Sequence, residues 1–190
     1  MVTAYHYTNE KAYRSILTGR DYGETGLLPI PRFIPLNRGS KLPREAHDGV
    51  VRALLEPEPQ SWLRNKDVPN VWSWLMGEVC REETVVLLSF DIKPGDRAFI
   101  TDTAHVQKML IQWDRPTKAE MNDAYRKYWE SRVPVLEYVG GYSMPEVIIQ
   151  SRIAPSRLRV EWTKPTNEFW NEVLRKDPEP PHEFRRPEAI

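Results

Sequence analysis

The sequence predicts an α+β fold, in which short strands and helices surround one hydrophobic core. The chain has 190 residues, which fits a single domain of ordinary size. Its 17 prolines favour short elements with rigid connections, because proline ends helices and interrupts central strands. The segment Thr84–Asp91 is a short β-branched, apolar run. It is too short for a buried helix and predicts a central strand.

Charge and composition narrow the class of protein. Lys and Arg total 27 and Asp and Glu also total 27, so the formal net charge is zero. This argues against a surface that chiefly neutralises phosphates or anionic lipid. No basic leader and no run of 18 apolar residues is found, so we expect no membrane contact and, by default, a cytoplasmic protein. The single cysteine, Cys80, is expected to be a buried structural thiol.

The chain is expected to begin with a strand and a helix. Val2–Tyr7 is rich in β-forming residues and predicts the first strand. Either Thr8 or Asn9 then caps a helix that continues to about Thr18, and Gly19 ends it.

Later elements follow the same local rules of periodicity and punctuation. Residues 21–43 are expected to form an irregular loop of the kind that binds ligands. Besides the central strand, we expect strands at Val50–Leu55, Ala98–Ile100, Pro145–Ile149 and Leu158–Trp162. Helices are expected at Val71–Cys80, from about Thr103 to Trp113, at Lys118–Ser131 and at Thr166–Arg175. Residues 177–190 are rich in proline and predict a disordered tail, so the single domain is expected to span residues 1–176.

Two positions are candidates for chemistry. His6 lies near the end of the first strand, where its ring nitrogens can face a cleft and the Thr8 hydroxyl can orient it. Alternatively, His6 is a hydrogen-bonded, half-buried strand residue. Glu146 opens an otherwise apolar strand, where partial desolvation of its carboxylate favours a cationic ligand. It could equally be an edge-strand charge that suppresses aggregation.

Taken together, these segments resemble the His-Tyr-Glu branch of the ADP-ribosyltransferase superfamily. The opening resemblance lies in Tyr5-His6-Tyr7-Thr8, the helix that follows, and Gly26-Leu27-Leu28-Pro29. The closing resemblance lies in Glu146-Val147-Ile148-Ile149 and the later Ile153-Ala154-Pro155-Ser156-Arg157-Leu158. The resemblance spans residues 3–162, although its motifs cover only a small part of that length.

The resemblance implies a split core of two small, mainly antiparallel sheets with peripheral helices. It also implies an enzyme, an NAD-dependent ADP-ribosyltransferase, for which NAD is the substrate and no metal is needed. His6 would hold a ribose hydroxyl, Tyr7 and Thr8 would contact NAD beside it, and Glu146 would stabilise the oxocarbenium-like charge that develops as nicotinamide leaves. The acceptor could be a protein, a nucleic acid, a small molecule or water. By analogy with the family, such a domain suits a bacterial or phage toxin or effector, with an antitoxin or immunity protein as a partner.

The sequence departs from the family in the middle motif. The corresponding segment, residues 48–55, has neither the aromatic nor the hydroxyl residue expected there, so the ring that stacks on nicotinamide is unassigned. Its candidates are Tyr5, Tyr7, Tyr22, Phe33 and Tyr142, of which Phe33 lies in the long loop.

Two other functions remain open. One is an RNA 2'-phosphotransferase-like enzyme on the same fold, which requires arginines that converge on the pocket; the candidates are Arg14, Arg20, Arg32 and Arg38. The other is a non-catalytic binding module, which the missing middle-motif chemistry favours.

Overall fold

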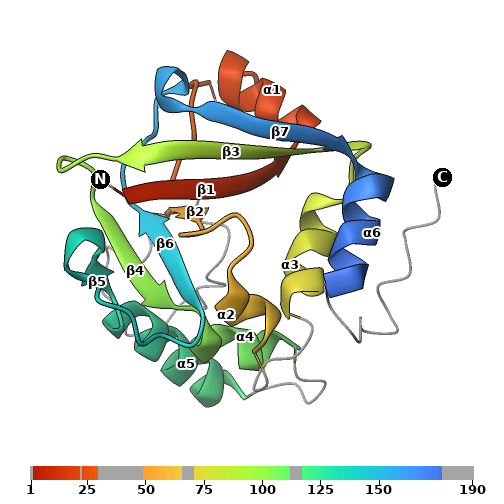
Figure 1. Ribbon diagram of the computed structural model, residues 1–190. Helices are drawn as coiled ribbons and strands as arrows, with labels where there is room; N and C mark the ends of the chain where they lie inside the picture. Colours follow the sequence, from red (N-terminus) through yellow and green to blue (C-terminus); the bar gives the residue numbers. More distant parts are fainter. Residues whose placement is uncertain (1, 22, 30–48, 66–70, 112–116, 177–190) are drawn as a thin grey trace.

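The computed structural model describes residues 2–21, 23–29, 49–65, 71–111 and 117–176 (Figure 1). Its elements in chain order are β1 (Val2–Asn9), α1 (Glu10–Thr18), β2 (Val51–Ala53), α2 (Gln60–Leu63), α3 (Val71–Val79), β3 (Thr84–Ile92), β4 (Ala98–Asp102), α4 (Ala104–Ile111), α5 (Lys118–Glu130), β5 (Val133–Pro134), β6 (Pro145–Ile149), β7 (Arg159–Pro165) and α6 (Thr166–Lys176). Two single 3-10 turns, η2 (Val135–Glu137) and η3 (Pro155–Arg157), complete the list.

The strands form two antiparallel sheets. One sheet has the order β1-β3-β7 and the other the order β2-β6-β4-β5. A bridge between Tyr5 and Leu54 connects β1 to the chain just after β2, so the two sheets meet at that edge. The predicted α+β class is confirmed at this level, and β3 is the central strand of its sheet, as its apolar run predicted.

Local sequence signals set the first helix. The Asn9 side chain caps α1 by accepting a hydrogen bond from the Ala12 amide at 2.9 Å. Gly19 ends the helix in the left-handed conformation, with φ of 71°, and its amide donates to the Ser15 carbonyl. Both ends of α1 are therefore confirmed.

The short helix α2 was not predicted. It follows a proline-rich turn, has no side-chain cap, and contains the buried Trp62. The Trp62 indole donates a hydrogen bond to the Pro145 carbonyl at 3.1 Å, so a contact with the start of β6 holds this helix in place. Because that contact joins distant segments, no local pattern announces it.

Three groups of buried side chains form the core. One lies between the two sheets and includes Phe90, Ile100 and Ile149. A second fills the space beneath α3 and α6, and a third packs α5 against β6. Figure 1 shows α3 and α6 beside each other, with α4 and α5 along the bottom of the view.

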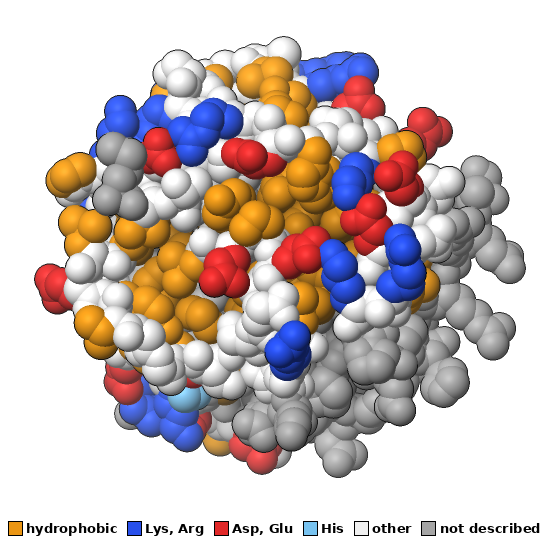
Figure 2. All heavy atoms as spheres, viewed as in Figure 1, with side chains coloured by type: hydrophobic (Ala, Val, Ile, Leu, Met, Phe, Trp, Pro, Cys, Tyr) orange, Lys and Arg blue, Asp and Glu red, His pale blue; other side chains and the backbone are white. Residues whose placement is uncertain are grey.

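The surface agrees with the zero net charge. Figure 2 shows Lys and Arg side chains interspersed with Asp and Glu on one face. On α5, for example, Asp123 pairs with both Arg126 and Lys127.

Cys80 is half-buried, and burial raises the pKa of its thiol to about 12. Among the described helices, none has both the length and the apolar character needed to cross a membrane.

Two predictions fall on residues outside the described part of the chain. They are the disordered tail, residues 177–190, and most of the long loop, for which residues 30–48 are not described.

Candidate functional site

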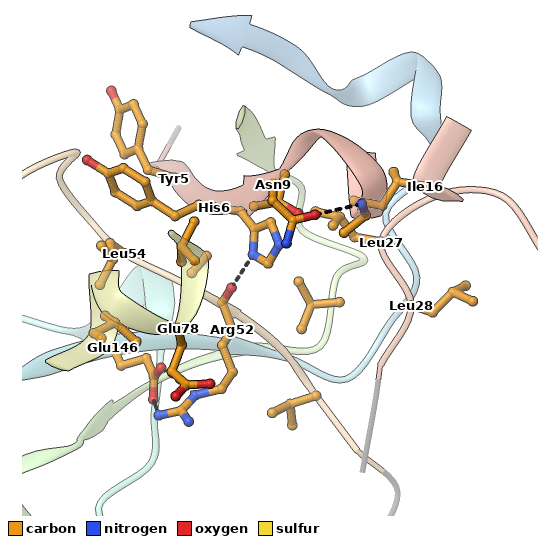
Figure 3. Close-up of a pocket in the computed structure, with 18 of the residues that line it drawn as sticks. Tyr5, His6, Asn9, Ile16, Leu27, Leu28, Arg52, Leu54, Glu78 and Glu146 are labelled. Atoms are coloured by element: carbon orange, nitrogen blue, oxygen red, sulfur yellow. Dashed lines mark hydrogen bonds and ion pairs between the residues drawn. The ribbon is translucent and has the colours of Figure 1, made fainter. Parts of the chain in front are cut away.

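A cavity of about 380 Å³ opens between the end of β1, α1, β2 and α3 (Figure 3). Its size falls within the range of small-molecule sites. The polar side chains in its wall include His6, Thr8, Asn9, Arg52, Glu78 and Glu146, and the apolar ones include Ile16, Leu27, Leu28, Val50, Leu75 and Val79.

Glu146 lies in the wall of this cavity although it is only 4% exposed. Its carboxylate accepts two hydrogen bonds from Arg52, from Nε to Oε1 at 2.5 Å and from Nη2 to Oε2 at 2.6 Å. Two hydroxyls also donate to Oε2, that of Thr103 at 2.9 Å and that of Tyr128 at 3.1 Å. Three donors thus hold Oε2 and one holds Oε1, so Oε1 keeps the greater capacity to meet a ligand.

Three separate elements supply these donors. Arg52 comes from β2, Thr103 from the turn between β4 and α4, and Tyr128 from α5. In the four-stranded sheet Arg52 lies opposite Ile148, two positions from Glu146 on the same face of β6. This register brings the guanidinium beside the carboxylate.

The chain just before Glu146 is held as firmly. The Asp102 carboxylate accepts hydrogen bonds from the backbone amides of Ser143, at 3.2 Å, and Met144, at 3.0 Å. It also accepts one from the amide of Ala104, the first residue of α4, so the same carboxylate connects the start of that helix to the chain before Glu146. The Trp62 indole donates to the Pro145 carbonyl, so each of the three residues before Glu146 has its backbone held by a side chain.

Arg52 and Glu146 form an ion pair that is largely removed from water. Burial alone would lower the pKa of Arg52, but the adjacent Glu146 carboxylate outweighs this effect and raises it. The guanidinium therefore stays charged. Burial, and then the negative charge of Glu146, raise the pKa of the Tyr128 hydroxyl, which stays a hydrogen-bond donor.

The His6 ring contacts the backbone carbonyl of the same arginine, Arg52. Its Nδ1 lies 2.8 Å from the Arg52 carbonyl oxygen, and because that oxygen only accepts, Nδ1 is the protonated nitrogen. Burial lowers the pKa of His6, although the bond to the Arg52 carbonyl opposes the change. The ring is therefore neutral at pH 7, and Nε2 is an acceptor.

The structure thus brings most of the predicted residues together. His6, Tyr7, Thr8 and Glu146 all line the cavity, and Arg52 links His6 to Glu146. The alternative for His6 also has support, since its ring is hydrogen-bonded and the residue is half-buried. The edge-strand alternative for Glu146 is wrong, because β6 lies between β2 and β4 in its sheet and Glu146 is buried.

Of the five candidates for the ring that stacks on nicotinamide, two line the cavity, one does not, and two lie outside the described residues. Tyr5 and Tyr7 line the cavity, but the Tyr7 ring packs against Trp72, Trp162 and Phe169, and its hydroxyl donates to a backbone carbonyl. Tyr7 is committed to the core, and Tyr5 packs against the same buried cluster, so the ring that would stack on nicotinamide is not identified among the described residues.

The expectation for Tyr142 needs correction. Tyr142 is not among the described residues of the cavity wall. Its ring packs on Tyr138 at 5.0 Å, and its hydroxyl donates to the Ser131 carbonyl, because the loop before β6 folds back on the end of α5. Tyr22 and Phe33 lie outside the described residues.

Sequence reasoning missed the residues that hold Glu146. Arg52 had a visible signal, a charged residue between the apolar residues of a short predicted strand. Thr103 and Tyr128 had none, because one was read as a helix cap and the other as part of an apolar helix face. In the described part of the chain, no group of three or more His, Cys, Asp or Glu side chains is arranged to hold a metal ion.

Comparison of the chain with protein-family models, with curated proteins and with solved structures finds no match. The functional argument therefore depends on the chemistry of this cavity. A fixed carboxylate, a neutral imidazole and a largely apolar wall suit a ligand that has hydroxyl groups, a flat apolar part and a centre of positive charge.

Proposed function

We propose that the protein is an NAD-dependent ADP-ribosyltransferase, which transfers ADP-ribose from NAD to an acceptor and releases nicotinamide. The observation that carries the proposal is the convergence of His6 and Glu146 on one cavity. These residues lie near opposite ends of the chain, and in the family that the sequence resembles they are the two residues that act on NAD.

The reaction needs a carboxylate more than it needs an acid. When the bond between C1' of the ribose and the nicotinamide nitrogen breaks, the electron pair goes to the pyridinium ring and neutralises it. Positive charge then develops at C1', and a preorganised carboxylate stabilises it. Oε1 of Glu146 takes this role, while Arg52, Thr103 and Tyr128 keep the carboxylate fixed.

The remaining polar groups also fit the substrate. Nε2 of His6 accepts a hydrogen bond from a ribose hydroxyl, as its neutral, Nδ1-protonated form requires. Among the described charged side chains of the wall, Arg52 pairs with Glu146 and Glu78 pairs with Arg81. The Glu146 carboxylate is the negative group beside which the cationic nicotinamide ring of NAD would lie.

One rival function has a specific observation in its favour. The Glu146 carboxylate already accepts four hydrogen bonds, as a purely structural ion pair would. A non-catalytic binding module on this fold is therefore the second candidate. The phosphotransferase-like alternative has less support, because Arg14 pairs with Glu10 at the surface, and neither Arg14 nor Arg20 is among the described residues of the cavity wall.

Thermal unfolding with NAD and nicotinamide release separate the two candidates. NAD at 100 times its dissociation constant should stabilise the wild type by about 2.7 kcal/mol. The enzyme should also release nicotinamide, and Glu146→Gln should bind NAD yet lose that release. The matched control is Glu137→Gln, at an exposed position away from the cavity, which should behave as the wild type.

Stabilisation by NAD without nicotinamide release supports the binding module. If millimolar NAD neither stabilises the protein nor is cleaved, the transferase proposal is wrong. Circular dichroism of Glu146→Gln shows whether the variant is folded, so that a lost activity is not mistaken for a lost structure.

A further inference from the structure

Transfer to a neutral acceptor requires a second group besides Glu146, and the argument here rests on the proposed function. A hydroxyl acceptor, or water, that forms a bond to C1' becomes a positively charged oxonium until its proton leaves. A base within hydrogen-bond reach of the acceptor removes that proton during the attack. The base has to lie where the acceptor enters, at the mouth of the cavity.

The two residues already assigned are poor choices for this base. Glu146 has both oxygens engaged by Arg52 and faces the developing cation. The acceptor nitrogen of His6 is occupied by the ribose hydroxyl. Among the described residues of the wall, Glu78 is the remaining carboxylate.

Glu78 has the position that the base needs. It lies in the last turn of α3, between the apolar wall residues Leu75 and Val79, and Figure 3 shows its side chain turned toward the end of the cavity that holds Arg52 and Glu146. Its side chain is 42% exposed, whereas that of Glu146 is 6% exposed. Glu78 therefore stands at the opening, in contact with both solvent and cavity.

The ion pair of Glu78 does not prevent this role. Its partner Arg81 reaches Oε1 at 2.5 Å from one turn along the chain, and the Arg81 side chain is 64% exposed. Pairs this exposed contribute little stability, because water screens them and long side chains lose entropy in forming them. An acceptor hydroxyl can therefore engage the carboxylate at small cost.

We propose that Glu78 is the general base of the transfer step. As the acceptor oxygen bonds to C1', its proton passes to the Glu78 carboxylate, and the electron pair of the broken C1'–N bond stays with neutral nicotinamide. The protonated Glu78 then returns its proton to water. No oxidant, reductant or metal enters this balance.

The test compares acceptors that do and do not carry a proton. Methanol, a small neutral acceptor, needs the base to form methyl ADP-ribose from NAD. Azide is an anion with no proton to lose, so it needs none. Both products are measured by chromatography for the wild type, Glu78→Gln, Glu78→Ala and Arg81→Ala.

We expect both Glu78 variants to form methyl ADP-ribose about 100-fold more slowly than the wild type. They should still bind NAD, measured as thermal stabilisation, and azide should restore product formation in Glu78→Ala to within a few-fold of the wild type with azide. Arg81→Ala removes the ion pair but keeps the base, so it should transfer to methanol at the wild-type rate.

Two results overturn the role of Glu78 alone: wild-type transfer to methanol by both Glu78 variants, or an equal loss of transfer to methanol and to azide. The second result would assign Glu78 to binding or folding. If the wild type itself releases no nicotinamide from NAD, the proposed function fails first and the role of Glu78 fails with it.

Discussion

Replacing Arg52 with methionine tests how the buried ion pair behaves. Arg52 and Glu146 have side-chain exposures of 20% and 6%, so the charge that remains is largely desolvated. Breaking one partner of such a pair costs about 3–5 kcal/mol. In Arg52→Met the carboxylate keeps the hydroxyls of Thr103 and Tyr128, which favours the lower end, about 3 kcal/mol. For a chain of this length that corresponds to a fall in Tm of about 6–12 °C.

The double variant gives the sharper result. Glu146→Leu should destabilise the protein by a similar amount, because it leaves the guanidinium of Arg52 uncompensated. Removing both charges relieves that penalty, so Arg52→Met combined with Glu146→Leu should be more stable than the sum of the single effects by about 2 kcal/mol.

Equilibrium unfolding in urea at pH 7 measures all four proteins. If the single effects add to within about 0.5 kcal/mol, the two side chains are not coupled, and the description of Glu146 as a carboxylate fixed by Arg52 is wrong. A wild-type Tm for Arg52→Met would contradict it equally.

Three further predictions concern the surroundings of the site. Gly26→Ala should lower the free energy of unfolding by at least about 2 kcal/mol, because Gly26 has φ of 98° and a Cβ there would lie 2.4 Å from the Ile153 carbonyl oxygen; Gly95→Ala, with open space around it, should be near neutral in the same urea titration. Because His6 has a lowered pKa when folded, the unfolded chain takes up its proton first as the pH falls below about 6.5, so wild-type stability should fall by up to about 1.4 kcal/mol per pH unit. His6→Gln should show a shallower loss between pH 7 and pH 5, and an identical slope would contradict the burial of His6. Tyr142→Phe should cost about 1 kcal/mol of stability and leave the thermal response to NAD unchanged; a lost response would return Tyr142 to the binding site.

The strongest local patterns predicted their elements correctly. The β-branched run became β3 because its side chains are apolar on both faces, and a strand of that kind has to lie inside a sheet. The cap at Asn9 and the glycine at Gly19 fixed α1, since both act through backbone hydrogen bonds within one turn. The helix α2 escaped prediction, because its stability comes from Trp62 and a carbonyl far along the chain.

In the candidate site, too, residues with a local signal were predicted and those that depend on distant contacts were not. His6 was singled out because a histidine near the end of a strand can turn its ring nitrogens to a cleft. Glu146 was singled out because a charged residue that opens an apolar strand is unusual, and both residues line the cavity. Arg52 was passed over because its importance depends on the register between β2 and β6, which no single strand records. Tyr142 was placed wrongly because an aromatic residue in a loop carries no sign of which way it folds.

By itself, the sequence determined the class of fold, the first helix and the central strand, and it singled out His6 and Glu146 as candidates for chemistry. These features follow from periodicity, capping and backbone geometry, which act over a few residues. Only the tertiary structure decided which donors hold the Glu146 carboxylate, which nitrogen of His6 meets the Arg52 carbonyl, and that the exposed Glu78 side chain belongs to the cavity wall. Those features depend on side chains from different strands and helices meeting across a desolvated space.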